Sequence, residues 1–212
     1  MKKAEIIIGI VALLAIIMNL LLFVGATILI VLSLSLLSCF YMYLSFALFN
    51  GVQLSNITNK ESYKGISTPR IIGAIGAGLA LSLTVIGILF KFQSYPGATF
   101  NLSVGLISLA VVTIVGLVKY FKTKSAFYTS IFKRVAIFGL FGLTLLYTPR
   151  TTIIDFKYRK HPAYLNALKQ AMANPDNKEM EEKADEEREI LYSGDDSTTI
   201  RKYYQSRRNR QK

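Results

Sequence analysis

Hydrophobic residues fill most of residues 5–149 in five runs, and short polar stretches separate these runs. About 20 apolar residues cross a bilayer as a helix, and four of the five runs come close to that length or exceed it. Lipid offers the backbone no hydrogen bonds, so such runs must be helical. The pattern predicts an all-α, polytopic integral membrane helix bundle with spans at about 5–23, 27–49, 71–92, 100–120 and 130–148.

The fifth run decides the topology. Its uncharged core, Val135–Tyr147, has 13 residues, which is short for a span. A full span requires Lys133 and Arg134 to extend toward the interface. The distribution of Lys and Arg favours four spans, because five would place Arg150 and the basic residues after it outside. The strongly apolar core favours five, so we predict five spans, with four as the alternative.

Residues 150–212 form a charged tail that we predict to be helical in part. An apolar stripe at helical spacing and an acidic segment near 178–192 predict two short helices within 150–193. Residues 194–212 are strongly basic, and we predict that they are disordered.

The charge of the chain is unevenly distributed. The net charge is +12, and residues 1–149 hold eleven Lys and Arg against two acids, Glu5 and Glu61. Basic loops between apolar runs are typical of cytoplasmic loops that contact anionic lipid head groups. No nucleic-acid-binding motif accompanies the basic residues, so we expect no nucleic-acid partner.

The chain offers little material for catalysis. It has one histidine, His161, and one cysteine, Cys39, and it has no acid between Glu61 and Asp155. We therefore predict no catalytic residue, no metal site and no cofactor, and thus a protein that is not an enzyme. Lys91 is an ionisable residue inside the predicted third span, which makes it a candidate for a functional polar group. The alternative is a lysine that extends to the membrane surface.

Small residues at helical spacing predict a helix-packing interface, either between copies of the chain or within one bundle. The candidate interface residues are Gly73, Ala74, Ala77, Gly78, Ser82, Gly105, Ser108 and Gly116. A weaker polar stripe on the second run consists of Ser35, Ser38 and Ser45.

Residues 86–110 read IGILFKFQSYPGATFNLSVGLISLA, with Phe90-Lys91 followed by the turn residues Pro96, Gly97 and Ala98. This segment resembles the membrane hairpin of GldL, the motor subunit of bacterial gliding motility and type IX secretion, over about residues 70–120. The resemblance implies a hairpin that packs against copies of itself or around a partner helix, with the Pro-Gly turn outside. Two positions depart from that family: Ser94 replaces its histidine, and Leu109 aligns with the glutamate that carries its protons.

Together these patterns predict a non-enzymatic subunit of the bacterial inner (cytoplasmic) membrane with a cytoplasmic N-terminus. It would form a homo-oligomer or hold a partner transmembrane helix in an envelope assembly related to gliding or secretion, without the motor's proton-carrying glutamate. The alternative is a small transporter or channel whose path is lined by Lys91 and the serine stripe of the second run.

Overall fold

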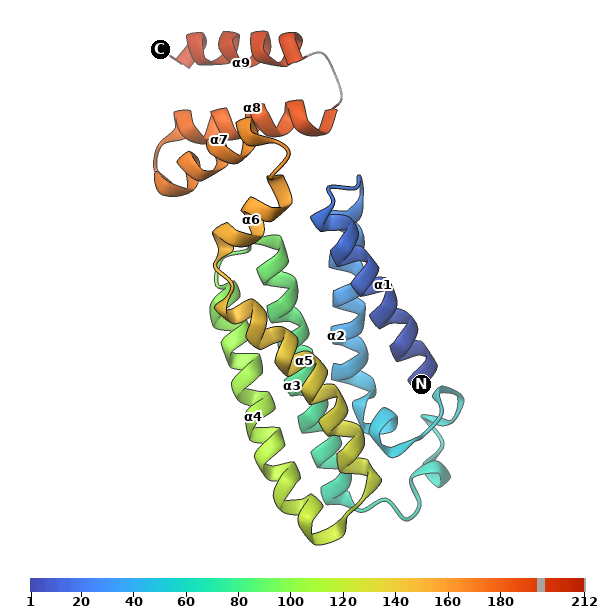
Figure 1. Cartoon of the computed structure of the whole chain (residues 1–212). Helices are drawn as coiled ribbons and strands as arrows, with labels where there is room; N and C mark the ends of the chain where they lie inside the picture. The colour runs from blue at the N-terminus through green and yellow to red at the C-terminus, as the bar shows by residue number, and fades with distance from the viewer. Residues whose placement is uncertain (194–196, 212) are drawn as a thin grey trace. The chain divides into compact units, whose positions relative to one another are not determined.

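The computed structural model describes residues 1–193 and 197–211, and the regular elements in these ranges are all helical. Five helices are long and apolar enough to cross a membrane (Figure 1). They are α1 (Lys2–Leu20), α2 (Ala26–Asn50), α3 (Thr68–Gln93), α4 (Ala98–Thr123) and α5 (Ala126–Tyr147). This confirms the predicted all-α membrane protein with five candidate spans. Because α5 begins at Ala126, its 22 residues extend for about 33 Å, which is enough for a span.

The chain divides into two compact units, Met1–Arg150 and Thr151–Lys212. The division lies next to the boundary between 149 and 150 that the composition predicts. In the first unit α3 packs against α2, α4 and α5, whereas α1 packs mainly against α2. The loop between α2 and α3 holds two short 3-10 turns, η1 (Leu54–Asn56) and η2 (Lys60–Tyr63).

The turn between α3 and α4 has the geometry that its sequence indicates. Gly97 has φ +73° and ψ 6°, the values of the third residue of a type II turn. The Ala98 amide donates to the Tyr95 carbonyl at 3.3 Å and closes the turn around Pro96 and Gly97. Glycine adopts this left-handed conformation without the steric cost of a Cβ atom.

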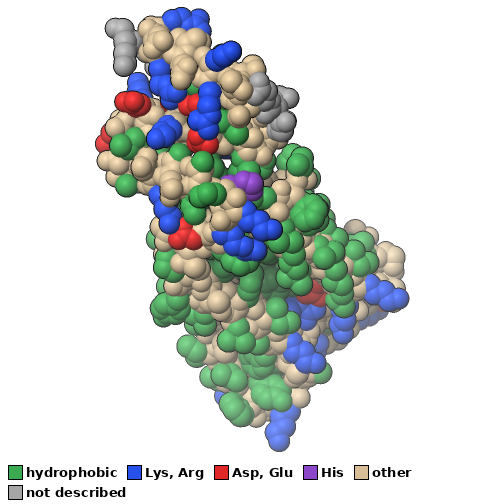
Figure 2. Space-filling model, turned by 45° about the horizontal axis from the view of Figure 1, so that its top comes forward, with side chains coloured by type: hydrophobic (Ala, Val, Ile, Leu, Met, Phe, Trp, Pro, Cys, Tyr) green, Lys and Arg blue, Asp and Glu red, His purple; other side chains and the backbone are tan. Residues whose placement is uncertain are grey.

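Large apolar side chains cover the outside of the membrane unit. Exposed examples on α1 and α4 include Ile7, Leu13, Ile107 and Phe121. Figure 2 shows such hydrophobic side chains over much of the visible face of this unit, whereas charges of both signs are mixed on the C-terminal unit. An apolar exterior of this extent is expected where lipid replaces water.

The second unit has more helical structure than the sequence predicts. Its helices are α6 (Arg150–Tyr158), α7 (Pro162–Ala173), α8 (Lys178–Ser193) and α9 (Ser197–Gln211). The region 150–193 therefore holds three helices rather than two. The rings of Tyr158 and Tyr164 meet edge to face at 4.6 Å, and burial raises the pKa of both hydroxyls above their usual range.

The predicted disorder of 194–212 is wrong for residues 197–211, which form α9. The physical reason is charge complementarity with the acidic helix α8. Arg208 donates to Glu186 at 3.0 Å, and Arg201 pairs with Glu187 at 3.1 Å. Tyr204 of α9 is buried as well. Residues 194–196 and 212 lie outside the described residues.

Candidate functional site

A buried ion pair joins the first and fifth membrane helices. Arg134 of α5 donates through Nε and Nη2 to the two carboxylate oxygens of Glu5 on α1. The Tyr41 hydroxyl of α2 donates to the same carboxylate at 2.7 Å. Glu5 is 8% exposed and Tyr41 is 1% exposed, so this three-helix network lies inside the bundle.

The remaining contacts of Arg134 complete the network. Its Nη1 donates to the carbonyl and the hydroxyl of Ser130, at 2.9 and 2.8 Å. The guanidinium lies 5.2 Å from the centre of the Phe49 ring, a cation–π contact. The Tyr41 ring packs edge to face on Phe138 at 5.5 Å. Both charges are therefore paired and hydrogen-bonded, the condition under which ionised groups are tolerated away from water.

Because Arg134 engages both oxygens of Glu5, the carboxylate anchors α5 to α1 rather than presenting an open binding group. Glu5 and Arg134 are not among the functional residues predicted from the sequence, although their contacts link three helices of the membrane unit. From the sequence, Glu5 enters only the charge count, and Arg134 is expected to extend toward the membrane interface. A usable signal was present: a chain with one acid in its first span and one arginine in its last can neutralise both by pairing them.

Lys91 lies in the last turn of α3 and is 7% exposed. Its Nζ donates to the Thr148 carbonyl at 3.3 Å, at the end of α5. A cation at a helix C-terminus is favourable, because the final carbonyls there lack intrahelical partners. The structure thus places Lys91 as a contact to the end of α5, rather than as a side chain extended into solvent.

Gly78 and Ser82 of the predicted interface on α3 face α2 of the same chain. Ala74, Ala77, Gly78 and Ser82 are buried. An added Cβ at Gly78 would collide with the Ser45 side chain and the Tyr41 carbonyl, so the two backbones approach closely there. The hydroxyls of Ser38 and Ser82 are hydrogen-bonded at 2.7 Å. This part of the small-residue row is therefore occupied inside one bundle.

Gly105 and Gly116, the glycines of the predicted interface on α4, also pack within the chain. An added Cβ would lie 2.7 Å from the Thr84 backbone at Gly105, and 2.9 Å from the Phe132 ring at Gly116. Ser108 donates to the Val104 carbonyl of its own helix at 2.8 Å. Gly73 of α3 differs, because an added Cβ there meets no atom within 4 Å.

The predicted polar path is divided between separate contacts. Ser38 bonds to Ser82, Ser45 lies at the close approach to Gly78, and Lys91 contacts the end of α5. The protein has an apolar groove between α1 and α5 and a cavity between the start of α3, α4 and the start of α5. Neither is lined by Lys91 or by these serines. The residues of the proposed path therefore line neither of these two cavities, and the transporter alternative stays a prediction.

A lateral groove of about 390 Å³ opens between α1 and α5. Gly9, Ile10 and Leu13 of α1 line one wall. Ile137 and Phe141 of α5 line the other, and residues of α2 and α3 form its floor. The groove is apolar, and it begins next to the Glu5–Arg134 pair, with Ile6 on α1 and Ile137 on α5.

Comparisons with protein-family models, curated proteins and solved structures find no match for this chain. The likeness of residues 86–110 to GldL therefore stays a prediction from the sequence.

The Glu5–Arg134 pair yields a quantitative prediction. Arg134→Gln leaves a buried carboxylate without its counter-ion and is expected to lower the free energy of unfolding by about 3–5 kcal/mol. The double variant Glu5→Leu with Arg134→Leu is expected to recover most of that loss, because it removes both charges. Denaturant unfolding in detergent micelles measures each value. Lys133→Gln is the matched control, because Lys133 is exposed and adjacent. A loss in the control equal to that of Arg134→Gln would contradict the assignment.

The close approach at Gly78 yields a second prediction. Gly78→Ala is expected to lower the free energy of unfolding by about 1–3 kcal/mol, since the added methyl forces α2 and α3 apart. Gly73→Ala is the control on the same helix and meets open space. It should be neutral or slightly stabilising, because alanine is the better helix former. Equal effects in thermal unfolding would show that α3 does not pack on α2 through Gly78.

Proposed function

We propose that this protein is a non-enzymatic, multi-pass subunit that holds a partner transmembrane helix in the groove between α1 and α5. The groove carries the proposal. It is apolar along its length and lies inside the membrane unit, where lipid chains or another helix are the available occupants. Gly9 adds a point of close approach, since an added Cβ there meets no atom within 4 Å. Small residues on a groove wall let a second helix backbone come near.

A partner helix fits these observations better than self-association through α3. Four of the five small residues in the α3 row, Ala74, Ala77, Gly78 and Ser82, are buried within the chain, so the row offers little free face. The resemblance of the α3–α4 hairpin to GldL supports a role in an envelope assembly of the bacterial inner membrane. At the position of that family's glutamate, this chain has Leu109, which is 2% exposed. The proposed subunit therefore holds a helix without conducting protons through that position.

Crosslinking inside native membranes tests the proposal. A photoreactive residue at Leu13, which lines the groove, is expected to crosslink to a transmembrane segment of one membrane protein. The same residue at Val118, which is exposed on α4 and does not line the groove, is the control. Gly9→Phe should fill the groove and reduce the Leu13 crosslink at least about tenfold, the result of losing roughly 1.4 kcal/mol of binding. A crosslink to lipid alone, to a second copy of this chain, or equally from Val118 would overturn the proposal.

The proposed orientation has its own test. A cytoplasmic N-terminus and five spans place the C-terminal unit on the opposite side of the inner membrane. Alkaline phosphatase fused after Asp155 or after residue 212 is therefore expected to be active, and green fluorescent protein at the same sites dark. An inactive phosphatase at both sites, with fluorescence from both fusions, would mean that α5 does not cross.

A further inference from the structure

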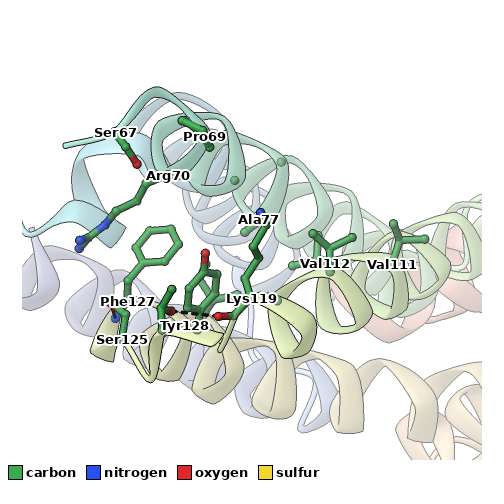
Figure 3. Close-up of a pocket in the computed structure, with 16 residues that line it drawn as sticks. Ser67, Pro69, Arg70, Ala77, Val111, Val112, Lys119, Ser125, Phe127 and Tyr128 are labelled. Carbon is green, nitrogen blue, oxygen red and sulfur yellow. Dashed lines mark hydrogen bonds between the residues drawn. The ribbon is translucent and has the colours of Figure 1, made fainter. Parts of the chain in front are cut away.

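A second cavity, of about 510 Å³, lies where the first turns of α3, the C-terminal half of α4 and the start of α5 meet (Figure 3). Arg70, Lys119 and Tyr128 come to it from these three helices. Figure 3 shows Lys119 reaching from α4 toward Ala77 on α3, with Tyr128 between Lys119 and Arg70. The cavity shares no lining residue with the α1–α5 groove, so the two sites are independent.

Within residues 1–149, all of which the structure describes, no carboxylate is left to pair with the two cations of this cavity. The acids of residues 1–149 are Glu5 and Glu61, and these are ion-paired with Arg134 and Lys64. The Nε of Arg70 is buried and has no hydrogen-bond acceptor among the described residues. The Arg70 guanidinium lies 4.7 Å from the centre of the Phe127 ring, which orients it without neutralising it. A buried donor on a charged group is costly until an acceptor is present, so the cavity favours an anion.

Away from its polar end the lining is apolar, and it opens toward the lipid-facing side of the bundle. Gly73 and Gly76 leave the α3 wall open, because an added Cβ at either meets no atom within 4 Å. Val111 and Val115 of α4 line the cavity and are 56% and 57% exposed. Val111 lies eight residues before Lys119, so the lining extends about 12 Å along α4 from the cation. A free anion would contact the polar end and leave this apolar length unused.

We infer that this cavity binds one anionic phospholipid, with its phosphate at the end lined by Arg70, Tyr128 and Lys119 and an acyl chain along α3 and α4 toward Val111. Tyr128 and Ser67 supply hydroxyl donors at the phosphate end. The lipid touches α3, α4 and α5 and so joins these helices at the end of the bundle opposite the Lys91–Thr148 contact. Anionic head groups in the cytoplasmic leaflet match the side on which the predicted orientation places Arg70 and Lys119.

Native mass spectrometry of the full chain in detergent tests this inference with dioleoyl phosphatidylglycerol and dioleoyl phosphatidylcholine as probes. The wild type is expected to retain one phosphatidylglycerol in preference to phosphatidylcholine. Each cation near an anionic lipid contributes about fivefold in affinity, so Arg70→Gln with Lys119→Gln should weaken phosphatidylglycerol binding on the order of 30-fold. Gly76→Leu should also abolish retention, because it fills the apolar part and leaves both cations in place.

Lys122→Gln with Lys124→Gln is the matched control. It removes the same charge from exposed positions that do not line the cavity, and it should bind as the wild type does. Equal weakening in this control, unchanged binding in the Arg70 and Lys119 variant, or full retention by Gly76→Leu would overturn the inference. Competition by millimolar inorganic phosphate would overturn it too, because the site would then take a soluble anion. Phosphatidylglycerol should raise the unfolding temperature of the wild type and the control but not of the cavity variants, which also shows that each variant is folded.

Discussion

A charge inside a bilayer must be paired, and the structure of the membrane unit depends on how this chain meets that requirement. Arg134 lies within α5 and would oppose insertion of that helix if it stood alone. Glu5 of α1 neutralises it through both carboxylate oxygens, and Tyr41 of α2 supports the carboxylate. The pair therefore allows the fifth apolar run to serve as a full helix of 22 residues, although only 13 consecutive residues in it are strongly apolar and uncharged.

The same pair explains where the bundle stays open. α1 packs mainly on α2, and α5 packs on α3 and α4, so the first and last spans meet through a polar contact rather than along a shared apolar face. Beyond the pair the two helices leave the α1–α5 groove, whose walls are apolar. At its far end, α5 is held by the hydrogen bond from Lys91 to Thr148. Polar contacts thus position α5, and the apolar surfaces between them remain available to lipid or to another helix.

Charge pairing also organises the C-terminal unit. Its acidic and basic segments look like separate solvated stretches in the sequence, because neither has a strong apolar face. In the structure, α8 and α9 carry opposite charges and pack against each other. Glu186 of α8 is 4% exposed and pairs with Arg201 and Arg208 of α9. Buried Tyr204 adds an apolar contact to these ion pairs. Helix formation in the basic terminus therefore depends on its neighbour and cannot be predicted from its own composition.

The sequence alone determined the membrane class, the approximate bounds of all five candidate spans and the turn at Pro96-Gly97, because each depends on local composition or on a few adjacent residues. It also marked Gly78 and Ser82 as packing positions, since small side chains permit close approach whatever the partner. Only the tertiary structure decided that α2 of the same chain is that partner. It alone paired Glu5 with Arg134 across 129 residues and brought Arg70 and Lys119 to one cavity. Such pairings depend on the relative rotation and tilt of helices, which side-chain packing sets and which no local pattern encodes.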